Sequence, residues 1–439
     1  MNDIRPFRGL RFDETVAGPL GSVVCPPYDV ISPLDQVNLY GRSPHNVVRL
    51  ELGLEFPEDS MESNRYTRAA ATMERWLSEG VLKAEQEPSF YIYEQRFPLD
   101  GASLVRRGLL ARLRLAPWED GVVLPHEETM AKPKEDRLQL MRATDCNLSP
   151  LFLLFDDPVG TVGLLMAEAA SLPPSAEADT GNGQLHRLWV VQGERVKGIT
   201  AALRELQLYM ADGHHRYETA LAYRDEVAGP DPSSSPEAAY NFALALLVDA
   251  RDPGLVVLPT HRLIHGIPAE RMDALANTLV GSFDLEPVPV PADGDAASKA
   301  EAITARMREQ ASGGPALGLY YLGGASILLR PRGGAKTTST RGRPVLDVDL
   351  LQELVLGPAL GIDSEELKAG TSVGYTRDAA ETIDAVDRGG AQAAFLLNPT
   401  RVEQVLETAR AGGRMPQKST YFHPKPETGL VINPLLAIS

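Results

Sequence analysis

The most chemically versatile residues of the chain are the consecutive group Asp212, Gly213, His214, His215 and Arg216. An arginine offers a planar fork of donors, histidines add further donors, and a glycine lets the backbone approach a phosphate closely. This is the only adjacent histidine pair among the eight histidines of the chain. A shared metal ion is the weaker interpretation, because the side chains of adjacent histidines diverge and no cysteine supports a zinc site. The group predicts an anion site; the alternative is a plain helix cap followed by exposed histidines.

The neighbouring segments predict how this group is positioned. Residues 207–211 form an apolar run typical of a short buried strand, and residues 217–227 repeat apolar side chains at helical spacing. A strand, a tight turn and a helix present the unpaired amide groups of the first helical turn and the positive end of the helix dipole. This arrangement suits a phosphate.

A second candidate lies at residues 124–129, where a proline-led turn carries His126, Glu127 and Glu128 ahead of a helix expected over residues 134–142. A glutamate beside a histidine can serve as a general base once its pKa is adjusted. Positive charge follows closely, supplied by Lys132, Lys134, Arg137 and Arg142. The alternative is a solvated, charged helix start, and this segment alone leaves both open.

A third candidate follows the helix expected over residues 400–411 and contains Lys418, Ser419 and Thr420. An ammonium group and two hydroxyls could line a phosphate site. The glycine-rich run of a Walker loop does not precede Lys418. The alternative is a polar terminal strand that covers the core.

Composition narrows the class of protein. With 439 residues, 43 % hydrophobic and 23 % charged, the chain has the make-up of a globular protein of two or three domains. A formal charge of −16 disfavours nucleic acid and anionic membranes as partners. Cys25 and Cys146 cannot form a disulfide scaffold. The first residues do not resemble a signal peptide and no apolar run reaches the ~20 residues of a membrane helix, so we expect a cytoplasmic protein.

The pattern of elements predicts an α+β (mixed α/β) fold. Residues 64–78 show one apolar helical face, whereas residues 89–93 and 108–115 read as strands. Proline- and glycine-rich segments at 171–183 and 229–236 read as loops. The expected domains are an amino-terminal α/β domain over residues 1–115, a middle portion over 116–260 and a carboxy-terminal α/β domain over 261–439.

Several sequence blocks resemble a known family along nearly the whole chain. They are Arg5 to Arg11, Cys25 to Ser32, Arg65-Tyr66, Leu124 to Glu127, Lys132 to Arg137, Asn147 to Pro150, Asp212 to Arg216, Leu258 to Arg262 and Met415 to Lys425. On these blocks the chain is identified as a member of the domain of unknown function family numbered 1015, whose name implies no activity.

From about residue 116 onward the chain is also similar to free serine kinases of the ParB/sulfiredoxin superfamily. This resemblance implies a ParB/sulfiredoxin-like catalytic core over residues 116–260, to which the carboxy-terminal domain contributes nucleotide-site residues. It implies that Glu127 acts on the serine hydroxyl and that Asp212 to Arg216 hold the nucleotide phosphates. It further implies that Lys418, Ser419 and Thr420 line the nucleotide site. The first ~115 residues have no counterpart in these kinases.

We therefore predict a kinase that transfers phosphate from ATP or ADP, with Mg²⁺, to a small hydroxyl substrate, with free L-serine as the first choice. Glu127, Asp212 and His214 would be catalytic, and Gly213, His215 and Arg216 would bind the nucleotide with the late Lys-Ser-Thr segment.

His126 and Arg8 are the candidates for binding the substrate. Arg8 belongs to a basic set with Arg5 and Arg11, which either binds a substrate carboxylate, covers the site or is structural. Two alternatives stay open for the protein as a whole: a nucleotide-binding regulator of ParB type without amino-acid turnover, and a hydrolase or phosphodiesterase that uses the histidine pair.

Overall fold

The computed structural model describes residues 1–127, 132–229, 235–310, 314–321, 323–333 and 345–436. Their contacts divide the chain into two compact units. Unit 1 contains residues 1–125, 129–256 and 422–439, and unit 2 contains residues 126–128 and 257–421. Residue 115, where a domain boundary was expected, falls inside unit 1.

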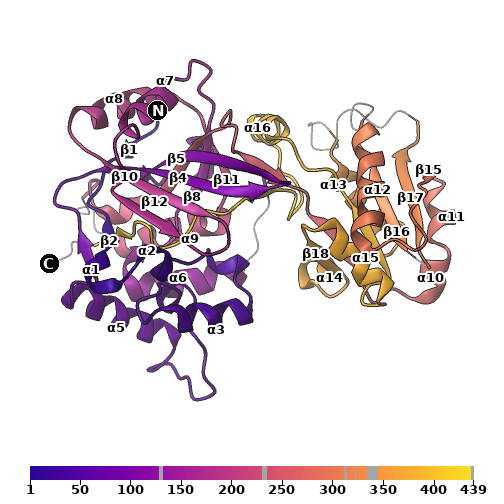
Figure 1. Cartoon of the computed structure of the whole chain (residues 1–439), viewed down its shortest axis with the longest axis horizontal. Helices are drawn as coiled ribbons and strands as arrows, with labels where there is room; N and C mark the ends of the chain where they lie inside the picture. The colour runs from indigo at the N-terminus through magenta and orange to yellow at the C-terminus, as the bar shows by residue number, and fades with distance from the viewer. Residues whose placement is uncertain (128–131, 230–234, 311–313, 322, 334–344, 437–439) are drawn as a thin grey trace. The chain divides into compact units, whose positions relative to one another are not determined.

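Within the described residues, unit 1 is built on a nine-stranded mixed sheet with the strand order β6-β11-β8-β12-β5-β4-β10-β9, to which β1 adds by pairing with β5 (Figure 1). Its strands are β1 (Ile4–Arg5), β4 (Phe90–Leu99), β5 (Ala102–Arg114), β6 (Val123–Leu124), β8 (Leu151–Phe155), β9 (Ala176–Asp179), β10 (Leu185–Val191), β11 (Leu208–Asp212) and β12 (Phe242–Asp249). The β11–β6 and β12–β8 pairs are parallel. The sheet takes strands from both sides of residue 115, which is why the first two expected domains form one unit.

Helices and short ribbons complete unit 1. The helices are α1 (Glu14–Ala17), α2 (Leu20–Val23), α3 (Pro33–Arg42), α4 (Val48–Glu51), α5 (Arg65–Ser78), α6 (Lys132–Thr144), α7 (Thr161–Ala169), α8 (Glu194–Leu203) and α9 (His214–Ala228). Two ribbons pair β2 (Leu10–Phe12) with β3 (Leu82–Ala84), and β7 (Cys146–Asn147) with β21 (Asn433–Pro434). Alternate residues of the central strands share one apolar core with α7, α8 and α9, so one face of the sheet is buried under these helices.

Several predicted elements are confirmed with shifted ends. Helix α5 matches its expected range, begins with a capping box at Asn64 and buries Ala69, Met73 and Trp76. Helix α9 begins at His214, three residues before the expected start. Strand β9 lies inside the expected loop at 171–183, where it forms the edge of the sheet beside β10.

A polar cluster lies buried inside unit 1. The Tyr93 hydroxyl is 2.8 Å from His186 Nδ1 and accepts a hydrogen bond from the Glu427 amide. His186 Nε2 is 4.0 Å from Glu427 Oε1, and no hydrogen-bond partner of Glu427 Oε2 is found among the described residues. Burial lowers the pKa of His186 to about 4 and raises the pKa of Glu427 to about 8. Both side chains are therefore mainly neutral at pH 7.

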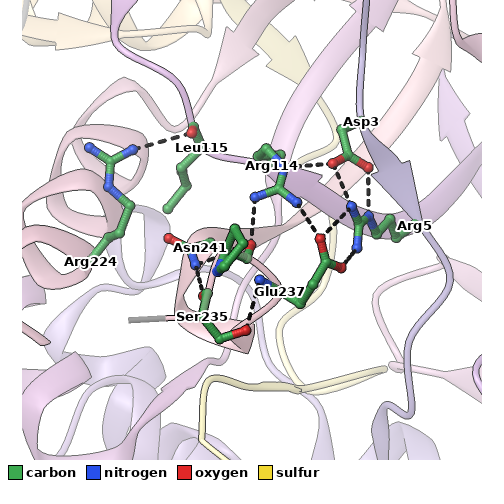
Figure 2. A network of polar contacts seen from close by, with 9 residues as sticks. Asp3, Arg5, Arg114, Leu115, Arg224, Ser235, Glu237 and Asn241 are labelled. Carbon is green, nitrogen blue, oxygen red and sulfur yellow. Dashed lines mark hydrogen bonds and ion pairs between the residues drawn. The ribbon is translucent and has the colours of Figure 1, made fainter. Parts of the chain in front are cut away.

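The amino-terminal arginines have partners within unit 1. Figure 2 shows Arg5 and Arg114 joined through Asp3 and Glu237, in a network that ties the amino terminus to the end of β5. Both guanidinium groups also lie over the Phe242 ring, at 4.8 and 4.5 Å from its centroid. These contacts give Arg5 a structural role.

Unit 2 contains a six-stranded sheet in the part of it that is described, with the order β15-β17-β16-β19-β14-β18 and antiparallel pairing throughout. Its strands are β14 (His261–Ile264), β15 (Phe283–Pro287), β16 (Leu317–Tyr321), β17 (Ala325–Pro331), β18 (Val373–Thr376) and β19 (Ala393–Leu396). Its helices are α10 (Ala269–Asp273), α11 (Leu275–Leu279), α12 (Ala296–Gln310), α13 (Asp347–Leu350), α14 (Ser364–Ala369), α15 (Ala379–Asp387) and α16 (Val402–Arg410), with a π-helical turn over Leu351–Leu356. Helices α12 and α15 pack on the sheet and form its core.

Two further strands, β13 (Val256–Leu258) and β20 (Tyr421–His423), lie where the chain passes from one unit to the other. The mixed content of helices and sheets confirms the predicted α+β class. None of the described helices has the length and apolar character that a membrane span requires.

Candidate functional site

The Asp-Gly-His-His-Arg group forms the turn between strand β11 and helix α9, as predicted. Asp212 ends β11, and Gly213 precedes α9 with φ +94°, a left-handed conformation that side chains rarely adopt. A Cβ atom added to Gly213 would lie 3.2 Å from the Arg216 guanidinium. The conformation therefore favours glycine here and the space beside it is tight; glycine has no side chain with which to cap the first amide groups of α9.

Asp212 lies in a half-buried ion-pair network inside unit 1. Its Oδ1 is 2.7 Å from Lys425 Nζ and its Oδ2 is 2.5 Å from Arg216 Nη2. Lys425 also forms an ion pair with Asp29. Burial alone would raise the pKa of Asp212, but the charges of Lys425 and Arg216 outweigh it and hold that pKa well below its ordinary value. Asp212 is thus a permanent carboxylate beside the positive end of a 15-residue helix.

Two side chains of the central sheet hold the backbone at and just before Lys425. Arg106, on β5, is fully buried and donates to the carbonyl groups of His423, at 3.2 Å, and Pro424. Gln95, on β4, donates to the carbonyl of Lys425 at 3.0 Å. Burial would lower the pKa of Lys425, but Asp212 and Asp29 raise it above its ordinary value, so the ammonium group stays charged.

Arg216 has partners that the sequence did not indicate. Its guanidinium group donates to Asp212 and to the carbonyl of Pro150, and the side chain is only 11 % exposed. These contacts hold the carboxylate of Asp212 in place. The structure thus gives Arg216 a positioning contact, and direct phosphate binding by its fork stays a prediction.

A small cavity borders Arg216 within unit 1. Its volume is about 40 Å³ and its polar lining comes from Glu51, Arg137, Asn147 and Ser149. This volume suits roughly two or three ordered waters. The cavity is therefore too small for a nucleotide.

His126 and Glu127 come together with the Lys-Ser-Thr segment in unit 2, although almost 300 positions separate them. His126 Nε2 is 2.9 Å from the Thr420 hydroxyl, and the Glu127 carboxylate accepts a hydrogen bond of 2.9 Å from the Lys418 amide. The two segments also form a parallel bridge between Glu127 and Met415. His126, Glu127, Lys418 and Thr420, which the sequence singled out separately, thus form one cluster.

The hydroxyl of Ser419 makes a local contact, and Glu128 cannot be placed. The Ser419 hydroxyl donates to the carbonyl of Pro416, so it closes its own turn. The Thr400 hydroxyl donates to the Ser419 carbonyl at 2.9 Å. Glu128 lies outside the described residues.

The remaining predicted residues have local partners. Arg8 donates to the carbonyl of Glu85 at 2.7 Å and Arg11 pairs with the Glu85 carboxylate at 2.6 Å. His214 and His215 are the first two residues of α9, and the His214 ring lies 6.4 Å from that of Trp118. The substrate role of Arg8 and the roles of the histidines stay predictions.

The described residues contain no cluster of three or more histidine, cysteine, aspartate or glutamate side chains able to hold a metal ion by themselves. Cys25 and Cys146 are buried and neither forms a disulfide. The Mg²⁺ of nucleotide sites relies on one or two carboxylates, with phosphate and water completing its shell. Asp212 and Asp29 are carboxylates of that chemistry.

A family model described as Protein of unknown function (DUF1015) matches residues 4–349. The chain belongs to this family. The membership predicted from the sequence blocks is confirmed, and the family description assigns no activity. No curated protein matches the chain.

Solved structures show a more distant likeness. A free serine kinase in complex with AMP is 15 % identical, covers 72 % of this chain and 86 % of its own, and has a TM-score of 0.36. A conserved hypothetical protein from Pyrococcus furiosus is 15 % identical, with 72 % and 90 % covered and a TM-score of 0.35. SbnI from Staphylococcus aureus, with a carboxy-terminal truncation, is 10 % identical, with 74 % and 87 % covered and a TM-score of 0.35. A likeness at this level assigns no activity to the chain.

Asp29 and Lys425 are the site residues that sequence reasoning missed. Both lie inside blocks that carry the family resemblance, at Cys25 to Ser32 and Met415 to Lys425. Their blocks were visible, but their contact with Asp212 was not, because 213 positions separate Lys425 from Asp212.

Proposed function

We propose that the protein is a nucleotide-dependent phosphotransferase that acts on a small hydroxyl substrate, with free L-serine as the first substrate to test. The observation that carries the proposal is the half-buried network of Asp212, Arg216 and Lys425 at the glycine turn before α9. Such a network holds charged groups in fixed positions, and phosphoryl transfer depends mainly on positioning and on charge neutralisation.

The charges of the network explain which groups would meet a phosphate. Asp212 and Asp29 balance Arg216 and Lys425, so these four side chains supply no net positive charge. Attraction for the nucleotide phosphates would then come from the first amide groups of α9, from the helix dipole and from Mg²⁺. Bound Mg²⁺ would neutralise phosphate charge, and Asp212 is the carboxylate proposed to hold it.

Glu127 is proposed to orient or deprotonate the substrate hydroxyl. The Lys418 amide fixes the direction of its carboxylate through the 2.9 Å hydrogen bond. A general base must be held in hydrogen-bonding reach of the proton that it removes, which is what such an anchor provides. His126 is fully buried against Thr420 and would support the turn that carries Glu127.

The decisive experiment measures nucleotide consumption by the purified protein with ATP or ADP, with and without L-serine. A phosphotransferase consumes nucleotide only when the amino acid is present and yields O-phosphoserine in equal amount. A nucleotide-binding regulator binds nucleotide without serine-dependent turnover, and a hydrolase consumes it without serine. Either of these two results would overturn the proposal.

A further inference from the structure

The segment from Leu258 to Arg262 is one of the blocks that carry the family resemblance, and none of its residues has a role in the reaction proposed above. Arg262 lies on β14, directly opposite Tyr375 on β18, and its guanidinium group is 4.8 Å from the Tyr375 ring centroid. The residue is only 3 % exposed. Burial lowers the pKa of Arg262 to about 10, so the side chain keeps its charge at neutral pH.

The hydrogen bonds of Arg262 lead to the cluster around Glu127 within unit 2. One nitrogen donates to the carbonyl of Thr260, and Nη2 donates to the carbonyl of Lys418 at 3.1 Å. Lys418 has φ +58°, a left-handed conformation that few residues other than glycine adopt. A buried donor on its carbonyl helps to keep it in that conformation.

The other side of Lys418 contacts the proposed base. The Lys418 amide donates to Glu127 Oε1 at 2.9 Å, so one residue links the guanidinium group of Arg262 to the carboxylate of Glu127. The charge of Arg262 also interacts with that of Glu127. Arg262 therefore acts on Glu127 in two ways, through the backbone of Lys418 and through its charge.

We infer that Arg262 is a positioning residue for Glu127: it holds the Lys418 backbone so that the Lys418 amide orients the carboxylate. The catalytic consequence rests on the proposed function, whereas the backbone contact does not. A purely structural arginine would contribute to folding and would leave the pH dependence of the reaction unchanged.

The first test measures hydrogen exchange of the Lys418 amide in the folded full chain. Arg262→Gln removes the charge and the fork, and should speed this exchange at least tenfold; Glu127→Gln should speed it as well. Arg271→Gln is the matched control, because Arg271 donates to the Leu360 carbonyl at 2.9 Å in the same unit. It should leave the Lys418 amide unchanged.

The second test compares steady-state kinetics. Arg262→Gln should lower kcat about tenfold, leave KM for the nucleotide unchanged and move the acidic limb of the kcat/KM profile to higher pH. Arg262→Lys should restore part of kcat, because an ammonium group keeps the charge but loses the fork. If the wild type lacks serine-dependent turnover, the proposed function fails while faster exchange still supports the positioning contact. Unchanged exchange in folded Arg262→Gln overturns the inference, as does an unchanged kcat and pH profile in an active enzyme.

Discussion

Replacing Glu427 with glutamine should remove a pH dependence that the wild-type protein has at neutral and mildly alkaline pH. Glu427 is 5 % exposed, and burial raises its pKa from 4.5 to about 8, against the opposing charge of Arg42. The nearest histidine, His186, is neutral at pH 7 because burial lowers its pKa to about 4. Folding therefore favours the protonated form of Glu427.

The sign and size of the effect follow from proton linkage. The folded protein binds this proton more tightly than the unfolded chain, so the stabilisation is complete below pH 4.5 and is lost as the pH rises through about 8. At about 1.4 kcal/mol for each pKa unit, the whole difference amounts to about 5 kcal/mol. Between pH 7 and pH 9 the remaining part to be lost is about 1 kcal/mol.

The assay is denaturant unfolding of the full chain at pH 7, 8 and 9. The wild type should lose stability over this range, and Glu427→Gln should lose less by about 1 kcal/mol because glutamine does not titrate. Glu177→Gln, at an exposed position on β9, should keep the slope of the wild type. Equal slopes in wild type and Glu427→Gln would refute the assignment of a protonated Glu427.

Three further predictions concern the turn at Asp212. Arg216→Ala should lower the free energy of unfolding by about 2 kcal/mol, since it removes one of the two cations from the half-buried carboxylate of Asp212. A tenfold loss of nucleotide affinity at unchanged stability would instead favour a direct phosphate contact. Lys425→Met should weaken nucleotide binding in calorimetric titration roughly tenfold or more, because it removes a charge-assisted hydrogen bond from Asp212. The control Lys299→Met, on α12, should not change the affinity. Equal affinities of Lys425→Met and wild type would remove Lys425 from the site. Gly213→Ala should lower the free energy of unfolding by about 1–3 kcal/mol, because the left-handed conformation and the nearby guanidinium group both disfavour a Cβ atom. An unchanged midpoint of thermal or denaturant unfolding would contradict this.

Local patterns predicted the elements whose apolar spacing is regular. Helix α5 was predicted because Ala69, Met73 and Trp76 recur at helical spacing, and these side chains are the ones it buries. The start of α9 was placed too late, because the first two helical residues are polar histidines and the helix begins directly after Gly213. Strand β9 was missed because a single residue, Ala178, is fully buried in it and the segment around it is rich in proline and glycine.

The site was predictable in its parts and not in its contacts. The sequence indicated the separate motifs of Glu127, Asp212 and Lys418, and the resemblance gave them roles. The sequence could not indicate that Lys425 pairs with Asp212, because that pair depends on how the carboxy-terminal segment returns to the sheet of unit 1. Contacts between residues far apart in sequence need the strand order, and local periodicity does not contain it.

The most direct test of the proposed phosphotransferase compares the wild type with Glu127→Gln. Serine-dependent nucleotide turnover and nucleotide affinity are measured on the same folded preparations, with a melting curve as the check on folding. We predict that turnover falls about 10²- to 10⁴-fold, the usual effect of losing a general base, while nucleotide affinity stays within about twofold. Serine-dependent turnover near that of the wild type in the folded variant would contradict the assignment of Glu127, and no serine-dependent turnover in the wild type would contradict the proposed function itself.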